Sequence, residues 1–440
     1  YYWRGTVWSR GEATPATSPV TWFETARYAL PWTGRFITSR FDLPQLRRRF
    51  TLHAPVRRAR LYACGVGLYK MFLNGAPVSA EELAPGFCAY DCWLPYQTYD
   101  VTAQLRSGEN ILGAWLGNGY YKGRVSWPGM EERRCIYGDE NALIAELTVE
   151  LENGETLLIP TDERWEASPS PFVRAEIYDG EAFDSRLWDR SWTLSAGEKA
   201  WEGAKLDTSL LQARKNLPVQ VMGTFRPTLL HAPNGDTLLD FGQNASGRIR
   251  VRGQWPAGTE IRLQTGEVLD KDGNLYRENL RTALSEQVYI CDGQPCDYAP
   301  TFTFFGFRYA RVLGLDTVDP ECFTMEVLYS AMEQTGQFSC SDPMVNRLFL
   351  NALWGQKSNF VDNPTDCPQR DERMGWTGDA QVFAPTACLN MNAQQFFHKY
   401  LYDLACEQKK TGFVPVTVPN ILFKTNMWGI PTTGWSDAAV

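Results

Sequence analysis

The sequence predicts a multidomain protein in which two β-sandwich or jelly-roll modules precede the start of an all-α domain. Its 440 residues exceed the roughly 250–300 residues that one hydrophobic core serves. Short runs that alternate polar and apolar residues recur between residues 36 and 330, as in strands, and near residue 340 the apolar spacing becomes helical. We expect the domains to cover residues 1–34, 35–215, 216–334 and 335–440.

The first segment reads as one strand, a turn over residues 11–19 and a second strand from Val20 to Thr25. Two strands do not form a stable sheet alone. We therefore expect residues 1–34 to be the tail of an upstream immunoglobulin- or fibronectin-like sandwich plus a linker. The chain lacks an initiator methionine, and we expect it to begin inside a longer protein.

Residues 35–215 are expected to form an N-terminal jelly-roll module. Residues 59–63 and 143–151 alternate with period two, and Asn74-Gly75 and Asn153-Gly154 are strong hairpin signals, because both residue types tolerate positive φ. A polar connector over residues 191–216 ends the module.

Residues 216–334 are expected to form a second β-sandwich. Alternation with one polar face recurs at residues 248–252, 260–264 and 308–312.

A helical domain is expected from residue 335. Ser341-Asp342-Pro343 is a helix start, with a capping oxygen and a proline in the first turn. Helices are expected after it and over residues 380–389 and 393–406. The first helix carries apolar residues at helical spacing, namely Val345, Leu348, Phe349, Ala352 and Leu353.

Composition excludes several classes of partner. A net charge of −8 argues against a nucleic acid, whose binding needs a basic face. No run of about 18 apolar residues suggests a membrane span. Sixteen Trp, nineteen Tyr and twenty-three Phe supply flat surfaces that can cover sugar rings, although most such side chains serve a β-sandwich core.

Cysteine and histidine usage indicates no cofactor or metal. Eleven cysteines without tight spacing are typical of reduced thiols and favour the cytoplasm, while secretion stays open because the natural N-terminus is not expected to be present. The only histidines, His53, His231 and His398, stand in no metal-ligand pattern. No phosphate-binding glycine loop occurs.

The chemistry concentrates in the stretch Asp366 to Asp379. It holds four carboxylates, two arginines and a tryptophan in fourteen residues, with Pro368 and two glycines shaping a loop. A sugar-cleaving site needs one protonated acid, carboxylates for hydroxyls and an aromatic wall. On composition alone, a solvated ion-pair network fits the same residues.

This loop, read as Asp366-Cys367-Pro368-Gln369-Arg370-Asp371-Glu372-Arg373-Met374-Gly375-Trp376-Thr377-Gly378-Asp379, resembles the signature of the α-L-rhamnosidases of glycoside hydrolase family 78. Further motifs of that resemblance are Leu83-Ala84-Pro85-Gly86, Leu116-Gly117-Asn118-Gly119-Tyr120, Gly242-Gln243-Asn244, Glu267-Val268-Leu269-Asp270, Glu278-Asn279-Leu280-Arg281 and Gly306-Phe307-Arg308-Tyr309. The resemblance implies that residues 335–440 are the first part of an (α/α)6 barrel.

The same resemblance implies roles for single residues. Glu372 matches the family's general acid, and Asp366, Arg370, Asp371, Trp376 and Asp379 match residues around the rhamnose subsite. Gly434-Trp435-Ser436-Asp437-Ala438 resembles a later barrel motif, so Trp435 and Asp437 are further site candidates, although Ser436 replaces an expected glycine.

A general acid must stay protonated near neutral pH, so burial or nearby negative charge must raise its pKa. Asp366, Asp371 and Asp379 could raise the pKa of Glu372, and Arg370 and Arg373 would lower it; the sequence does not say which lies nearer. In the family the general base is a late barrel glutamate, and we expect it beyond Val440.

The expected function is inverting hydrolysis of terminal non-reducing α-L-rhamnosyl groups from plant glycosides or polysaccharides. The partners are then rhamnose-containing glycosides, and a homodimer is one candidate assembly. Two alternatives stay open at this point: a non-catalytic carbohydrate-binding or structural fragment, and an (α/α)6 glycosidase for another sugar.

Overall fold

The computed structural model describes residues 1–11, 14–25, 27, 30–125, 133–193, 197–202, 206–424 and 431–439. The chain divides into two compact units, Tyr1–Thr33 and Gly34–Val440. Among the described residues, none of the helices has the length and apolarity that crossing a membrane requires.

The first unit is an antiparallel ribbon of short strands. β1 (Tyr2–Trp3) pairs with β4 (Thr21–Trp22), and β2 (Thr6–Val7) pairs with β3 (Ala16–Thr17). The two predicted strands therefore do pair.

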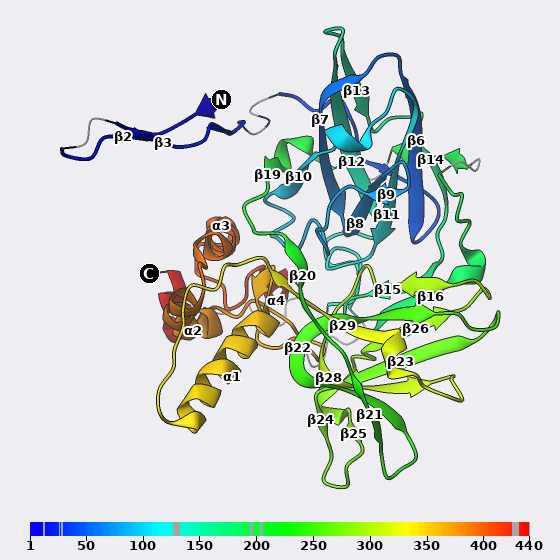
Figure 1. The fold of residues 1–440 in the computed structure, drawn as a ribbon, viewed down its shortest axis with the longest axis vertical. Coiled ribbons are helices and arrows are strands. Elements are labelled where there is room, and N and C mark those ends of the chain that lie inside the picture. The colour runs from blue at the N-terminus through cyan, green and yellow to red at the C-terminus, as the bar shows by residue number, and fades with distance from the viewer. Residues whose placement is uncertain are drawn as a thin grey trace. The chain divides into compact units, whose positions relative to one another are not determined.

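The second unit begins with two facing sheets around one core (Figure 1). The first sheet runs β18 (Trp201–Glu202), β5 (Ile37–Thr38), β12 (Ala142–Leu151), β7 (Val56–Val66), β10 (Leu94–Asp100) and β19 (Leu211–Ala213), with β13 (Thr156–Pro160) on β12. The second runs β17 (Glu198–Lys199), β14 (Glu166–Pro169), β6 (Pro44–Leu52), β11 (Gly108–Gly117), β8 (Leu68–Leu73) and β9 (Ala76–Pro77).

The core lies between these sheets. Leu61 and Leu147 of the first sheet meet Leu46 and Leu112 of the second, and all four side chains are fully buried. Asn74 and Gly75 adopt φ of 53° and 84° between the paired strands β8 and β9, which confirms the predicted hairpin.

The strands of the next region are hydrogen-bonded into one continuous ten-stranded sheet. Its order is β15 (Phe172–Glu176), β16 (Gly180–Asp184), β26 (Glu286–Ile290), β23 (Glu260–Gly266), β28 (Phe305–Leu313), β22 (Thr237–Gly253), β29 (Phe323–Ser330) and β20 (Val219–Phe225). β21 (Thr228–His231) and β27 (Cys296–Tyr298) also pair with β22, and β24 (Val268–Leu269) pairs with β25 (Leu275–Tyr276).

Two features explain this continuity. β22 is seventeen residues long, and its register on β28 shifts between Asp240 and Ala245, where Gly242 has φ of 75°; such a shift bends a strand without ending it. In addition, β15 and β16 precede the predicted connector yet join this sheet, with β16 parallel to β26.

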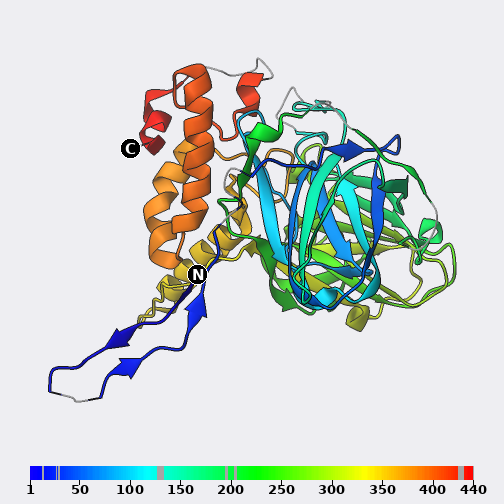
Figure 2. The ribbon, with the colours of Figure 1, turned by 90° about the horizontal axis from the view of Figure 1, so that it is seen from above.

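The helical region lies to one side of the sheets in both views (Figures 1 and 2). It contains α1 (Pro343–Asn359), α2 (Thr377–Asn390), α3 (Gln394–Thr411) and the short α4 (Ile421–Lys424) and α5 (Thr433–Ser436). The Asp342 side chain caps α1 by accepting from the Met344 amide at 2.8 Å, so the predicted helix start is confirmed. α1 contacts β22 and β29.

Candidate active site

The acidic loop lies between α1 and α2, after the small ribbon of β30 (Phe360–Val361) and β31 (Asn363–Pro364). It closes on itself, because Asp366 Oδ1 accepts from the Met374 amide at 3.1 Å and the Asp366 amide donates to the Met374 carbonyl at 3.2 Å. Side chains of the loop are thereby turned toward one another.

The β-rich part of the chain holds the loop in place. The Arg373 guanidinium is buried and donates to the carbonyls of Phe304 at 2.8 Å and Ile177 at 3.2 Å. Tyr178 donates its hydroxyl proton to the Glu372 carbonyl at 2.6 Å. Arg373 therefore anchors the loop backbone, and Arg370 is the loop arginine that reaches the carboxyl of Glu372.

Glu372 is buried beside Asp366 in the acidic loop. It is 4% exposed. Its Oε1 accepts from the Trp376 indole at 3.0 Å, and its Oε2 lies 2.9 Å from Arg281 Nη2 and 3.2 Å from Arg370 Nη2. Three donors thus fix the carboxyl group in one orientation.

The pKa of Glu372 is raised from 4.5 to about 7. Burial is the largest cause, and the neighbouring Asp366 adds to it, while Arg370 and the Trp376 indole oppose them. The proton is therefore retained near neutral pH, as a general acid requires.

Asp371 is buried beside Glu372 but has different partners. Arg281 Nε donates to Asp371 Oδ1 at 2.6 Å, and the Thr282 hydroxyl also bonds to this carboxylate. Arg281 therefore contacts both acidic neighbours, from a backbone conformation with φ of 56° that few non-glycine residues adopt.

Sequence reasoning assigned no role to Arg281, Thr282 or Tyr178. Arg281 is the last residue of the motif Glu278-Asn279-Leu280-Arg281, and its place in that motif was the one sequence feature that could have marked it as a site residue. Its contact with Glu372 spans 91 residues of sequence.

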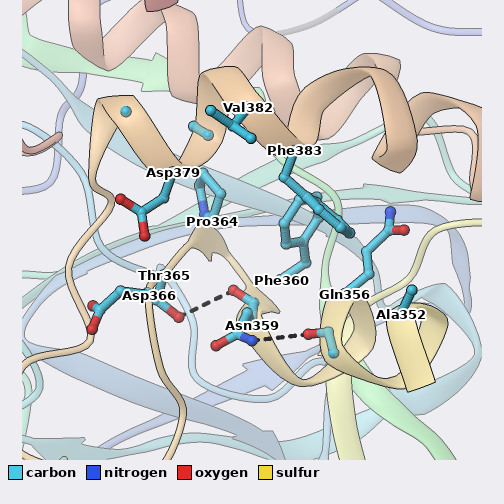
Figure 3. Close-up of a pocket in the computed structure, with 13 residues that line it drawn as sticks. Ala352, Gln356, Asn359, Phe360, Pro364, Thr365, Asp366, Asp379, Val382 and Phe383 are labelled. Carbon is cyan, nitrogen blue, oxygen red and sulfur yellow. Dashed lines mark hydrogen bonds between the residues drawn. The ribbon is translucent and has the colours of Figure 1, made fainter. Parts of the chain in front are cut away.

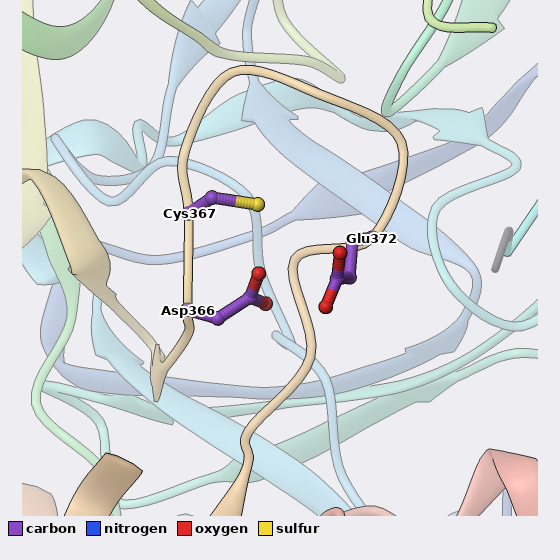
Figure 4. Close-up of side chains that lie close together, drawn as sticks. All are labelled: Asp366, Cys367 and Glu372. Carbon is purple, nitrogen blue, oxygen red and sulfur yellow. The ribbon is translucent and has the colours of Figure 1, made fainter. Parts of the chain in front are cut away.

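The side chains of Asp366, Cys367 and Glu372 converge in the loop (Figure 4), and one potential ligand atom from each lies within 4.8 Å of the others. Arg370 meets all three, with Nη2 3.2 Å from each carboxylate and Nε 3.3 Å from Cys367 Sγ. Burial raises the pKa of the Cys367 thiol to about 12. Arg370 already supplies a positive charge here, and the expectation of no metal stays a prediction.

A cavity of about 530 Å³ opens beside the loop (Figure 3). Asp366 and Asp379 lie at one end of it, and Phe360, Val382 and Phe383 at the other. Burial and the nearby Asp366 raise the pKa of Asp379. The cavity therefore combines an acidic end with an apolar end.

Of the two candidates after the loop, Trp435 contacts the loop and Asp437 does not. The Trp376 ring packs edge-on against Trp435 at 5.2 Å. A side chain at Gly378 would overlap that indole, because its Cβ position lies 2.3 Å from Trp435 Nε1. Asp437 is exposed, and within the described chain no hydrogen bond or ion pair joins it to the loop.

A glycoside hydrolase requires a buried carboxyl that keeps its proton near neutral pH and a cavity that can hold a sugar ring, and this loop offers both. Three family models match the chain in succession. They describe an alpha-L-rhamnosidase N-terminal domain over residues 54–223, a bacterial alpha-L-rhamnosidase concanavalin-like domain over residues 230–329 and a bacterial alpha-L-rhamnosidase 6 hairpin glycosidase domain over residues 333–440.

Individual proteins agree with these models. An alpha-L-rhamnosidase of Streptomyces avermitilis is 39% identical over 419 residues, which are 93% of this chain and 40% of that protein. The structure of alpha-L-rhamnosidase from Dictyoglumus thermophilum matches with a TM-score of 0.89 at 32% identity, covering all of this chain and 51% of the other. A Streptomyces avermitilis alpha-L-rhamnosidase complexed with L-rhamnose matches with a TM-score of 0.83 at 33% identity, covering 97% of this chain and 44% of the other.

The chain belongs to the α-L-rhamnosidase family. It spans between 40% and 50% of the length of the curated relatives it matches.

Proposed function

We propose that the protein containing this chain is an inverting α-L-rhamnosidase that removes terminal, non-reducing α-L-rhamnosyl groups from plant glycosides or polysaccharides. The observation that carries the proposal is the environment of Glu372. Burial and Asp366 raise its pKa, so that the carboxyl holds its proton near pH 7. N–H groups of Trp376, Arg281 and Arg370 contact its two oxygens. Such a group can donate a proton and then be stabilised as a carboxylate.

Glu372 is proposed to act as the proton donor. The Glu372 carboxyl protonates the glycosidic oxygen as the bond to the anomeric carbon breaks. The resulting carboxylate is stabilised by the Trp376 indole and by the guanidinium groups of Arg281 and Arg370. These donors stabilise the Glu372 carboxylate that exists after proton transfer, whereas burial and Asp366 favour the protonated carboxyl that exists before it.

The sugar is proposed to occupy the cavity beside the loop. Asp366 and Asp379 accept hydrogen bonds from its hydroxyls, and Phe360 and Phe383 face the apolar part of the ring. A 6-deoxyhexose has hydroxyls on one part and a methyl group on another, so this division of the lining favours rhamnose over a fully hydroxylated hexose. Trp376 contributes aromatic surface next to the acid, and Trp435 packs against it.

The general base is not proposed among the carboxylates of the loop. Inverting pairs stand roughly 6.5–9.5 Å apart, to leave room for water. Asp366 offers an oxygen within 4.8 Å of Glu372, which is too near for that task. We propose that the base comes from a part of the whole protein outside residues 1–440.

The finer domain organisation is part of the same proposal. Residues 35–215 are assigned to a jelly-roll module, 216–334 to a β-sandwich module and 335–440 to the first part of an (α/α)6 barrel, with 1–34 as the tail of an upstream sandwich. The contribution of β15 and β16 to the ten-stranded sheet means that the first two modules share a sheet in space.

Activity on matched aryl glycosides tests the proposal. The full-length protein is expected to hydrolyse p-nitrophenyl α-L-rhamnopyranoside with a kcat/KM at least about 100-fold above that for the β-D-glucopyranoside, because hydroxyl-binding carboxylates discriminate strongly. Release of p-nitrophenol measures the rates, and NMR should show β-L-rhamnose as the first-formed sugar. Equal rates on both glycosides would contradict the assignment.

The pH profile tests the environment of Glu372. Since the acid must be protonated, kcat/KM is expected to fall as pH rises through about 7. Arg281→Gln removes a cation 2.9 Å from Glu372, so the alkaline limb should move upward by about one pH unit or more. Arg226→Gln is the matched control, because Arg226 is exposed and contacts Glu321. An unmoved limb in the Arg281 variant would argue against this role.

A further inference from the structure

A buried arginine outside the acidic loop is linked to Glu372 by a series of hydrogen bonds. Arg124 belongs to the β-rich part of the chain and is 7% exposed. Its Nη2 donates to Asp179 Oδ1 at 2.6 Å, and its Nε donates to Asp179 Oδ2 at 3.3 Å. Glu176 Oε2 accepts from the Arg124 amide at 3.1 Å, so both the backbone and the side chain of this arginine are fixed. The proposed reaction gives Arg124 and Asp179 no task.

The same guanidinium also reaches Thr282, which follows Arg281 in the chain. Arg124 Nη1 donates to the Thr282 hydroxyl at 2.8 Å. Because the hydroxyl oxygen accepts from Arg124, its own proton is available to a further acceptor, and it donates to Asp371 Oδ2. Asp371 Oδ1 accepts in turn from Arg281 Nε at 2.6 Å, and Arg281 Nη2 lies 2.9 Å from Glu372 Oε2. An unbroken series of hydrogen bonds therefore joins Arg124 to Glu372.

The pair of Arg124 and Asp179 also restrains the backbone next to Arg281. Arg281 has φ of 56° and ψ of −113°, a conformation that a non-glycine residue keeps only where its surroundings hold it. Arg124 Nη2 donates to the Thr282 carbonyl at 3.1 Å, and Asp179 Oδ1 accepts from the Leu284 amide at 3.4 Å. These contacts fix the residues that follow Arg281, and with them the direction in which its side chain leaves the backbone.

Charged groups face the Glu372 carboxyl from two segments. Asp366 and Arg370 belong to the acidic loop and pair with each other. Arg281 comes from the segment between β25 and β26. Its contact with Glu372 is therefore one that residues outside the loop can control.

We propose that Arg124 is a positioning residue for the reaction and that it acts by holding Arg281 against Glu372. This inference rests on the proposed function, in which Glu372 is the proton donor. Arg124 is not among the residues that line the cavity proposed for rhamnose, so its effect falls on the acid rather than on sugar binding. Without this support the Arg281 guanidinium leaves Glu372, and the carboxylate formed by proton transfer loses a stabilising cation.

Changes at Thr282 test the link, because Thr282 is exposed and variants there should fold. Thr282→Val keeps the shape of the side chain but removes the hydroxyl. In the full-length protein, Thr282→Val and Arg124→Gln are each expected to lower kcat for p-nitrophenyl α-L-rhamnopyranoside about tenfold, with KM changed by less than about twofold. Thr282→Ser should recover most of that loss, because it keeps the hydroxyl.

The matched control is Arg186→Gln. Arg186 binds Asp184 at the end of β16 through two hydrogen bonds, at 2.9 and 2.7 Å, and it should keep the parent kinetics when changed. Parent-like kinetics in Thr282→Val would overturn the proposal.

Coupling between the two arginines separates positioning from a general loss of stability. Arg124→Gln should move the alkaline limb of kcat/KM upward, as Arg281→Gln does, because each change weakens the same cationic contact with Glu372. Adding Arg124→Gln to Arg281→Gln should then move the limb no further. A full additional shift in the double variant would refute the proposed path through Arg281.

A measurement without substrate separates this inference from the proposed function. The Trp376 indole donates to Glu372 Oε1 at 3.0 Å, so the NMR signal of its N–H should titrate with that carboxyl; loss of the signal in Trp376→Phe assigns it. The midpoint is expected at about 7 in the parent and at least about half a pH unit higher in Thr282→Val. An unmoved midpoint would contradict the inference even in an active rhamnosidase. Failure to hydrolyse any rhamnoside would defeat the proposed function and leave a shifted midpoint standing.

Discussion

Replacing Glu372 with Gln is expected to lower kcat on an aryl α-L-rhamnoside by about 10²–10⁴-fold, because a positioned general acid contributes that much. Gln keeps the size of Glu and can still accept from the Trp376 indole, which donates to Glu372 at 3.0 Å. Its amide, however, has no acidic proton to donate to the glycosidic oxygen. The loss should grow as the departing phenol becomes more basic, since a poor leaving group needs protonation most. Initial rates on a series of substituted phenyl rhamnosides measure both effects.

One control accompanies this variant. Glu321→Gln changes an exposed carboxylate whose side chain is 80% accessible, and it should retain the full rate. A Glu372→Gln enzyme that kept more than about a tenth of the rate would show that another group donates the proton.

The pH dependence of stability gives an independent check on the raised pKa of Glu372. The pKa of Glu372 is raised in the folded chain, from 4.5 to about 7. The folded state therefore binds the proton more tightly than the unfolded state, and the free energy of unfolding falls as pH rises across that interval. Gln does not titrate, so the variant should lose less stability between those pH values than the parent.

Local signals in the sequence were enough to predict most elements. Asn74-Gly75 and Asp342-Pro343 act through their own backbone and capping chemistry, and the structure places the hairpin and the helix start there. The path of β15 and β16 was not predictable in this way. β16 pairs with β26, which lies about a hundred residues further along the chain, and pairing over that distance leaves no mark in either segment.

The apolar stripe of α1 shows another limit of periodicity. The spacing of Val345, Leu348 and Leu353 predicted the helix correctly, yet Leu353 is buried while Leu348 is 66% exposed. The periodicity of apolar residues identifies the face of α1 that can be buried. It does not identify the element that packs against this face. Among the described residues, nothing buries the outer part of this stripe.

Some contacts of the candidate site could be predicted from the sequence, and others could not. The acidic loop is contiguous, so Asp366, Arg370 and Glu372 could be proposed together, and the structure brings them into contact. The contacts from Arg281 and Tyr178 join residues 91 and 194 positions apart. They depend on how the ten-stranded sheet meets the loop, which only the folded chain defines.

A second large effect is expected at Lys399, a residue of α3 that is 1% exposed. Its Nζ lies 2.7 Å from Asn363 Oδ1, 3.2 Å from Asp362 Oδ2 and 3.3 Å from Asp403 Oδ2. The two carboxylates in turn accept from the Phe87 amide at 2.7 Å and the Trp93 indole at 2.6 Å. One lysine therefore ties the loop of residues 84–93 to the helices that carry the site.

Lys399→Met is expected to lower the opening free energy of α3 by about 3–5 kcal/mol, because it leaves two carboxylates buried without their cation. Hydrogen exchange of the α3 amides measures this loss. Lys409→Met is the matched control, since Lys409 is exposed on the same helix, and its effect should stay within about 0.5 kcal/mol.

The pH dependence distinguishes loss of the cation from loss of packing. Burial raises the pKa of Asp403, and removing Lys399 should raise it further above its unfolded value. The folded variant then takes up protons as pH falls, so the stability that it loses relative to the parent should be smaller at acidic pH than at alkaline pH. Adding Asp403→Asn to Lys399→Met should likewise recover part of the loss. A deficit that was equal at acidic and alkaline pH and unaffected by Asp403→Asn would mean that Lys399 acts through its methylene chain alone.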